Sequence, residues 1–167
     1  MPDRVNFGNS QNQPGMRVVA YSIKSFEKEP LAKANHKKHD ITLISNSLSA
    51  ETVSYAEGKE AVIVFTDDLV SAAVIDRLAD LGVKYIATRS TDIQHIDQEA
   101  AIRRNISIAN VPALAMRSIG ADDLSLALAH ETILNLDKWQ QNCCLGDACV
   151  CASYCNRIKT QKPDHES

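Results

Sequence analysis

Apolar and amphipathic stretches alternate along the chain from Arg17 onward. Short runs rich in β-branched and other apolar residues predict five strands, at residues 17–22, 40–45, 61–65, 83–88 and 105–111. The third run is apolar at every position, which is typical of a parallel strand covered on both faces. Stretches with helical spacing separate the runs, so the pattern predicts repeated strand–helix units.

The clearest predicted helix follows the third strand. Val74, Leu78 and Leu81 are spaced i, i+4 and i+7, Ser71 can cap the first turn, and Gly82 suits the position after the last turn. Further helices are predicted at 27–38, 49–58, 97–104 and 119–140, the third capped by its first residue, an aspartate, and followed by an asparagine suited to a left-handed conformation. The segment 124–129 is apolar almost all round, which predicts that it is buried.

Five strands separated by helices predict an α/β fold, a flavodoxin-like doubly wound sheet of five parallel strands with helices on both faces. Ligands of such sheets bind beyond the carboxyl ends of the strands, which directs attention to the loops at 22–26, 65–69, 89–95 and 112–119. Arg89 is the cation placed to meet a carboxylate there, with a salt bridge to Asp92 or Asp67 as the alternative. Asp67 and Asp68 are interpreted as a solvated loop.

Composition narrows the class of protein. Hydrophobic residues make up 44% of the chain and charged residues 23%, as in globular domains. A net charge of −3 and the lack of a long apolar run argue against nucleic-acid and membrane partners, so we expect a cytoplasmic protein. We divide the chain into a flexible leader at 1–15, one domain at 16–140 and an irregular cysteine-rich tail at 141–167.

All five cysteines lie in the tail. Thiolates at this density could bind zinc or a cluster, and Cys149, Cys151 and Cys155 are the candidate ligands. No C-x-x-C pair is present, however, so we assign no metal site and keep this one as an alternative. The other interpretations are a reactive tail and a tail derived from a shifted reading frame.

Two segments carry a family resemblance. The sequences VVAYSIKSFEKEPL (18–31) and AVIVFTDDLVSAAVIDRLADLGVKYIATRSTDIQHIDQEAAIRRNISIANVPA (61–113) resemble the catalytic domain of D-isomer-specific 2-hydroxyacid dehydrogenases, closest to the D-lactate dehydrogenase branch. The resemblance covers about residues 16–138. It implies a domain that holds a 2-keto or 2-hydroxy acid, while a second domain binds NAD and supplies the catalytic Arg, Glu and His.

The chain departs from the family pattern in the loop after the fourth strand and in the segment after NVPA. The loop is of the type TRSxGxDxID in the family, and here Asp92 replaces the glycine and Gln94 the aspartate. In the segment after NVPA, Leu114 stands where the family has a tyrosine facing the substrate. We therefore expect weakened substrate binding, through Arg89 and the backbone amides of Ser90 and Thr91.

No dinucleotide-binding motif is present, because the six glycines do not form G-x-G-x-x-G. The residues after Gln140 are too few for one further strand–helix–strand unit of about 30 residues. We therefore expect a chain truncated before the NAD domain, without cofactor or catalytic residues and inactive alone. The alternative is a non-catalytic interaction module that forms a homo-oligomer through its last helix.

Overall fold

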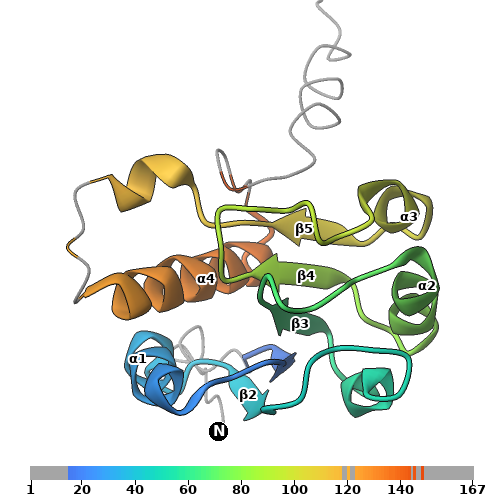
Figure 1. Cartoon of the computed structure of the whole chain (residues 1–167), viewed down its shortest axis with the longest axis horizontal. Helices are drawn as coiled ribbons and strands as arrows, with labels where there is room; N and C mark the ends of the chain where they lie inside the picture. The colour runs from blue at the N-terminus through green and yellow to red at the C-terminus, as the bar shows by residue number, and fades with distance from the viewer. Residues whose placement is uncertain (1–14, 118–119, 121–122, 144, 146–147, 149–167) are drawn as a thin grey trace, which may run out of the picture.

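The computed structural model describes residues 15–117, 120, 123–143, 145 and 148. One sheet of five parallel strands crosses the molecule in the order β2-β1-β3-β4-β5 (Figure 1). The strands are β1 (Arg17–Ala20), β2 (Asp40–Leu43), β3 (Ala61–Val64), β4 (Tyr85–Thr88) and β5 (Ser107–Ala109). The predicted flavodoxin-like sheet is confirmed. The chain runs from β1 to β2 on one side and then crosses to β3 on the other side of β1, so the switch in strand order lies between β1 and β3.

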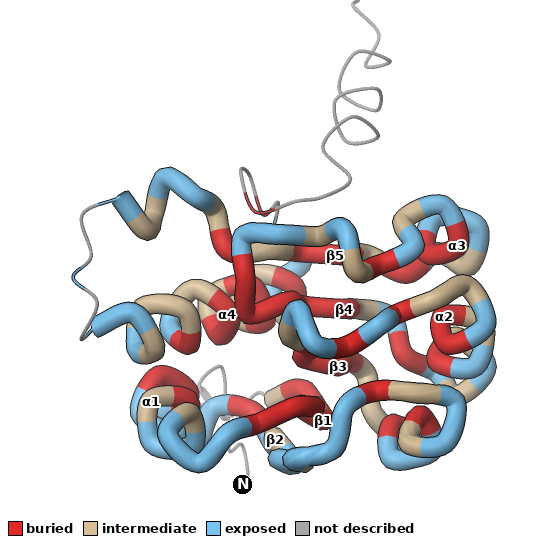
Figure 2. The backbone as a smooth tube through the Cα atoms, in the orientation of Figure 1, coloured by how far each residue is buried: buried red, intermediate tan, exposed pale blue. Residues whose placement is uncertain are grey.

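Helices cover both faces of the sheet (Figures 1 and 2). They are α1 (Ser25–Asn35), α2 (Ala72–Asp80), α3 (Gln98–Arg103) and α4 (Leu124–Gln140), with the 3₁₀ turns η2 (Val53–Ala56) and η3 (Ala113–Met116). Successive strand residues point to opposite faces. Val18 therefore packs with α1 and α4, while Val19 packs with α2, α3 and η2.

Local capping explains where two of these helices begin and end. Ser71 accepts a hydrogen bond from the Val74 N–H at the start of α2, and Asp97 accepts one from the Ala100 N–H at 3.0 Å at the start of α3. Gly82 and Asn105 follow these helices with φ of 97° and 58°. The predicted caps and left-handed positions are therefore confirmed.

Two helix predictions need correction. The helix predicted at 49–58 is only the 3₁₀ turn η2, because Ser49 and Thr52 hydrogen-bond each other and the nearby backbone. Helix α4 begins at Leu124, and its first turns are not buried as predicted. Leu124 and Leu126 are each 42% exposed. In the described part of the chain, no helix is long and apolar enough to cross a membrane.

Core contacts continue beyond the end of α4. Leu145 and Ala148 are buried in the same apolar cluster as Leu136 and Trp139. The end of α4 is also tied to the sheet through His39, whose side chain is fully buried. Its Nδ1 accepts from the Met16 N–H at 3.1 Å, so its Nε2 donates to Asp137 at 2.8 Å.

Asp68 joins three loops at the carboxyl edge of the sheet. Its side chain is buried, with Oδ1 accepting from Ser22 Oγ and the Leu48 N–H and Oδ2 from the Phe65 N–H, each at 2.7 Å. These donors follow β1, β2 and β3. The interpretation of Asp68 as part of a solvated loop was therefore wrong. It holds only for Asp67, whose side chain is 56% exposed.

We expect Asp68→Asn to lower the free energy of unfolding by about 2–3 kcal/mol, because an amide NH₂ would face a donor that now meets a carboxylate oxygen. Asp67→Asn is the matched control and should cost less than about 1 kcal/mol, since it removes only a surface ion pair with Lys24. Urea unfolding of both variants measures the difference. Equal losses in the two variants would contradict this account of Asp68.

Candidate functional site

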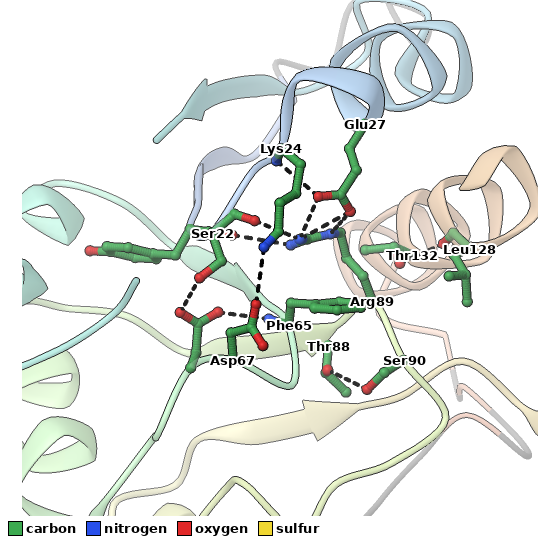
Figure 3. A network of polar contacts seen from close by, with 12 residues as sticks. Ser22, Lys24, Glu27, Phe65, Asp67, Thr88, Arg89, Ser90, Leu128 and Thr132 are labelled. Carbon is green, nitrogen blue, oxygen red and sulfur yellow. Dashed lines mark hydrogen bonds and ion pairs between the residues drawn. The ribbon is translucent and has the colours of Figure 1, made fainter. Parts of the chain in front are cut away.

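Three chain segments meet above the carboxyl ends of β1, β3 and β4 (Figure 3). They are the β1–α1 turn at 21–24, the β3–α2 turn at 65–70, and residues 89–97 after β4, which we call the β4 loop. An isolated bridge between Val70 and Ile96 holds the second segment against the third. The geometry expected from a doubly wound sheet therefore places these loops together.

Arg89 is the central cation of this edge and is only 3% exposed. Its guanidinium donates to the Tyr21 and Ser22 carbonyl oxygens, each at 3.2 Å, and forms an ion pair with Glu27 at 3.2 Å. It also lies over the Phe65 ring, 4.9 Å from the ring centroid. Figure 3 shows how these contacts join the end of β4 to the first turn of α1.

The sequence left two roles open for Arg89, binding a ligand carboxylate or forming a salt bridge with Asp92 or Asp67, and its contacts decide between them. The salt bridge exists, but its partner is Glu27 rather than Asp92 or Asp67. Because every nitrogen of the guanidinium already has an acceptor, Arg89 could bind a substrate carboxylate only by giving up part of this set. In this structure Arg89 supports the loops.

Side-chain hydroxyls shape the β4 loop from within. Thr88 Oγ1 and Ser90 Oγ lie 2.9 Å apart, and Ser90 Oγ donates to the Asp92 carbonyl oxygen at 2.9 Å. Asp92 is exposed, and its Oδ1 accepts from the Gln94 N–H at 3.0 Å. Asp92 therefore closes a turn through its own carboxylate.

The backbone N–H groups of Ser90, Thr91 and Asp92 have no hydrogen-bond acceptor among the described residues. Thr91 and Asp92 are exposed, while Ser90 is 9% exposed. Successive free N–H groups in a loop form a site for an anion such as a carboxylate. The structure thus brings the Ser90 and Thr91 amides, which the sequence predicted as ligands, together with the Asp92 amide, which it did not.

His95 lies at the far end of the β4 loop. Its Nε2 is 3.3 Å from Thr88 Oγ1, and its Nδ1 is buried without a partner in the described part of the chain. Burial lowers the pKa of His95, and the charges of Asp92 and Asp68 oppose this shift. The neutral imidazole is therefore the form that suits the folded loop.

Of the other predicted positions, one is exposed and the rest lie outside the described residues. Leu114 lies in η3 and is 61% exposed. Cys149, Cys151 and Cys155 lie outside the described residues, so the metal alternative stays a prediction. Among the residues that the structure describes, no group of three His, Cys, Asp or Glu side chains could hold a metal ion.

A model of the D-isomer specific 2-hydroxyacid dehydrogenase catalytic domain matches residues 18–142. The chain belongs to this family. A 2-hydroxyacid dehydrogenase homolog of Zymomonas mobilis is 32% identical over 130 residues, covering 76% of this chain and 39% of that protein. An aromatic 2-oxoacid reductase of Clostridium sporogenes is 29% identical over 68% of this chain and 35% of its own length.

A solved structure supports the same assignment. The apo structure of D-lactate dehydrogenase from Escherichia coli superposes with a TM-score of 0.57 at 32% identity, over 58% of this chain and 31% of that one. The chain therefore spans less than two fifths of these relatives. The fold and the family were both predicted from the sequence.

Binding of NAD needs a glycine-rich strand–helix turn that presents N–H groups to the pyrophosphate at a helix N-terminus. None of the described glycines lies in the turns after β1, β3 or β4. At the start of α1, the Glu27 carboxylate accepts from the Lys24 N–H at 2.9 Å and so already places a negative charge there. The described residues therefore do not fit NAD.

Sequence reasoning missed two residues that build the site, Glu27 and Asp68. Glu27 stands three residues after the cap position of α1, where a carboxylate is favoured, and this was a usable signal. Asp68 follows an equally acidic neighbour, and nothing in the local pattern distinguishes the buried carboxylate from the exposed one. Only the approach of the three loops makes the difference.

The lowered pKa of His95 predicts pH-dependent stability. In the unfolded chain His95 has the ordinary histidine pKa of about 6.5, so it binds a proton more readily there than in the folded chain. The free energy of unfolding should therefore be complete above about pH 6.5 and fall as the pH drops toward the lower pKa of the folded state. His95→Gln should flatten this dependence, measured by urea unfolding between about pH 5 and pH 8. The exposed His130→Gln should leave the slope unchanged, and equal slopes in all three proteins would refute the assignment.

Proposed function

We propose that this chain is a substrate-binding domain of the 2-hydroxyacid dehydrogenase type, which holds the carboxylate of a 2-oxo or 2-hydroxy acid on the β4 loop. The observation that carries the proposal is the run of N–H groups from Ser90 to Asp92 at the carboxyl edge, which have no acceptor among the described residues. These amides are the ligands, and Arg89 acts behind them by fixing the end of β4 against α1. Family membership supports the substrate class.

The names of the relatives support the same class of acid without deciding its side chain. One relative is an aromatic 2-oxoacid reductase and another a D-lactate dehydrogenase, so the family accepts acids of different size. Asp92 places a negative charge beside the proposed carboxylate site, and Leu114 offers no hydroxyl to a substrate. We infer that binding to this chain is weaker than binding to a family member with the glycine and the tyrosine.

The reaction of the family needs a hydride donor and a group that moves a proton to the substrate oxygen. The described residues do not fit NAD, and His95, the histidine of the β4 loop, has no hydrogen bond to a carboxylate among the described residues that could support proton transfer. We therefore propose that the 167-residue chain by itself binds and orients the acid without turning it over. Its composition favours a cytoplasmic location.

Binding should be measured with oxamate, a stable 2-oxo acid analogue, by titration of the ¹⁵N-labelled full chain. We expect amide shifts centred on Ser90, Thr91 and Asp92. Asp92→Asn keeps the acceptor for Gln94 but removes the charge, so it should bind oxamate about five-fold more tightly. Shifts scattered away from the β4 loop would refute the site, and oxidation of NADH by pyruvate above background would refute the claim of inactivity.

A second candidate function is self-association, and the exposed apolar surface between α1 and α4 favours it. Phe26 is 67% exposed, and beside it Leu124 is 42% exposed. These two residues help to line a pocket of about 230 Å³ together with Leu31, Phe65 and Leu128. Exposed apolar residues gathered around a pocket are a common mark of an association surface, and we propose a second copy of the chain as the partner.

Light scattering over a range of concentrations tests this candidate. We expect a dimer that Leu124→Glu converts to a monomer, because the charge would be buried in the contact. Ile102→Glu on α3 is the matched control, since Ile102 is 57% exposed on the opposite face of the sheet and should leave the dimer intact. A wild-type chain that stays monomeric at high concentration would exclude self-association.

A further inference from the structure

Asn110 lies directly after β5, beside the β4 loop, and joins three separate segments. Its N–H donates to the Ala148 carbonyl oxygen at 3.0 Å. Its side-chain Nδ2 donates to the Thr91 carbonyl oxygen at 2.9 Å. Its own carbonyl oxygen accepts from Asn135 Nδ2 on α4 at 3.1 Å. Because Asn135 is 2% exposed, an amide there would be costly to leave unpaired.

The Thr91 contact bears on the proposed carboxylate site through peptide geometry. In a trans peptide the C=O and the following N–H point in opposite directions, and the described chain contains no cis peptide bond. A bond that holds the Thr91 carbonyl oxygen therefore sets the direction of the Asp92 N–H. Asn110 thus holds one end of a peptide unit whose other end is a proposed ligand.

Three consecutive carbonyl oxygens of the β4 loop are held in this way. The Ser90 oxygen accepts from the Val111 N–H at 2.9 Å, the Thr91 oxygen from Asn110 Nδ2, and the Asp92 oxygen from Ser90 Oγ at 2.9 Å. Each bond leaves the N–H of the following residue on the opposite side of the same peptide unit. Only the middle bond uses a side chain from outside the loop, so it is the one that a substitution can remove cleanly.

We propose that Asn110 is a positioning residue for the β4 loop and that Asn135 anchors it to α4. The proposal rests on the proposed function, in that it says how the carboxylate-binding amides are aimed. Two hydrogen bonds, from Asn135 to Asn110 and from Asn110 to Thr91, therefore connect α4 to the Thr91–Asp92 peptide, so a displacement of α4 would move this peptide. Neither asparagine touches the ligand.

The test compares Asn110→Ala with the wild-type full chain in two measurements. Asn110→Ala removes the Thr91 contact and leaves the backbone bonds to Ala148 and Asn135 in place. Without ligand, the ¹⁵N order parameters of Thr91 and Asp92 should fall and their amide shifts should change. With oxamate, the dissociation constant should rise about five-fold while the melting temperature moves little.

Two further variants complete the design. Gln94→Ala is the control, because Gln94 is an exposed side-chain amide in the same loop whose side chain makes no hydrogen bond to a described residue, and it should change neither measurement. Asn135→Ser should loosen the loop to a smaller extent, and Asn110→Ala carries the test alone if this buried substitution does not fold.

The outcomes separate the two proposals. If the wild-type chain does not bind oxamate, the proposed function fails, and the ligand-free order parameters still decide whether Asn110 holds the loop. If Asn110→Ala matches Gln94→Ala in those parameters, the positioning role is overturned. A looser loop with unchanged oxamate affinity would overturn its importance for the ligand.

Discussion

A guanidinium buried at the end of a strand must find a carboxylate and further acceptors, and this requirement organises the carboxyl edge of the sheet. Arg89 meets it with Glu27 and the carbonyl oxygens of Tyr21 and Ser22. These acceptors lie on the β1–α1 turn, so the pair joins β4 to the first turn of α1. Leaving either charge alone would cost several kcal/mol, about 3–5 for a buried pair. The turn and the helix are therefore held at one distance from the β4 loop.

Two further sets of hydrogen bonds complete this edge, one made by Asp68 and one made by the carbonyl oxygens of the β4 loop. Asp68 uses its carboxylate to gather the loops after β1, β2 and β3. Within the β4 loop, the carbonyl oxygens of Ser90, Thr91 and Asp92 all accept hydrogen bonds from protein donors. The N–H groups of the same residues have no acceptor in the described part of the chain, so they can meet solvent or a ligand. Such a loop can present N–H groups to a carboxylate, and its carbonyl oxygens are held by residues 110–111 and by Ser90 of the loop itself.

The extent of prediction differs between fold and site. Runs of apolar residues predicted all five strands, although each proved shorter, because the pattern marks burial and the hydrogen-bonded ladder covers only part of each buried run. The β4 loop was also predicted as the site, since Arg89, Ser90 and Thr91 follow a strand. The roles within it were not. Glu27, Asp68 and Asn110 are distant in sequence from the loop, and their contacts depend on how loops approach after folding.

By itself, then, the sequence determined the order of strands and helices, the α/β class and the family, because these depend on periodicity, caps and local motifs. Tertiary structure alone decided which acidic residue is buried, which carboxylate pairs with Arg89 and which loop amides have no acceptor among the described residues. It also decided that Leu124 and Leu126 are exposed at the start of α4. The reason is physical: side-chain burial and hydrogen-bond partners at a sheet edge are set by segments that meet only when the sheet has formed.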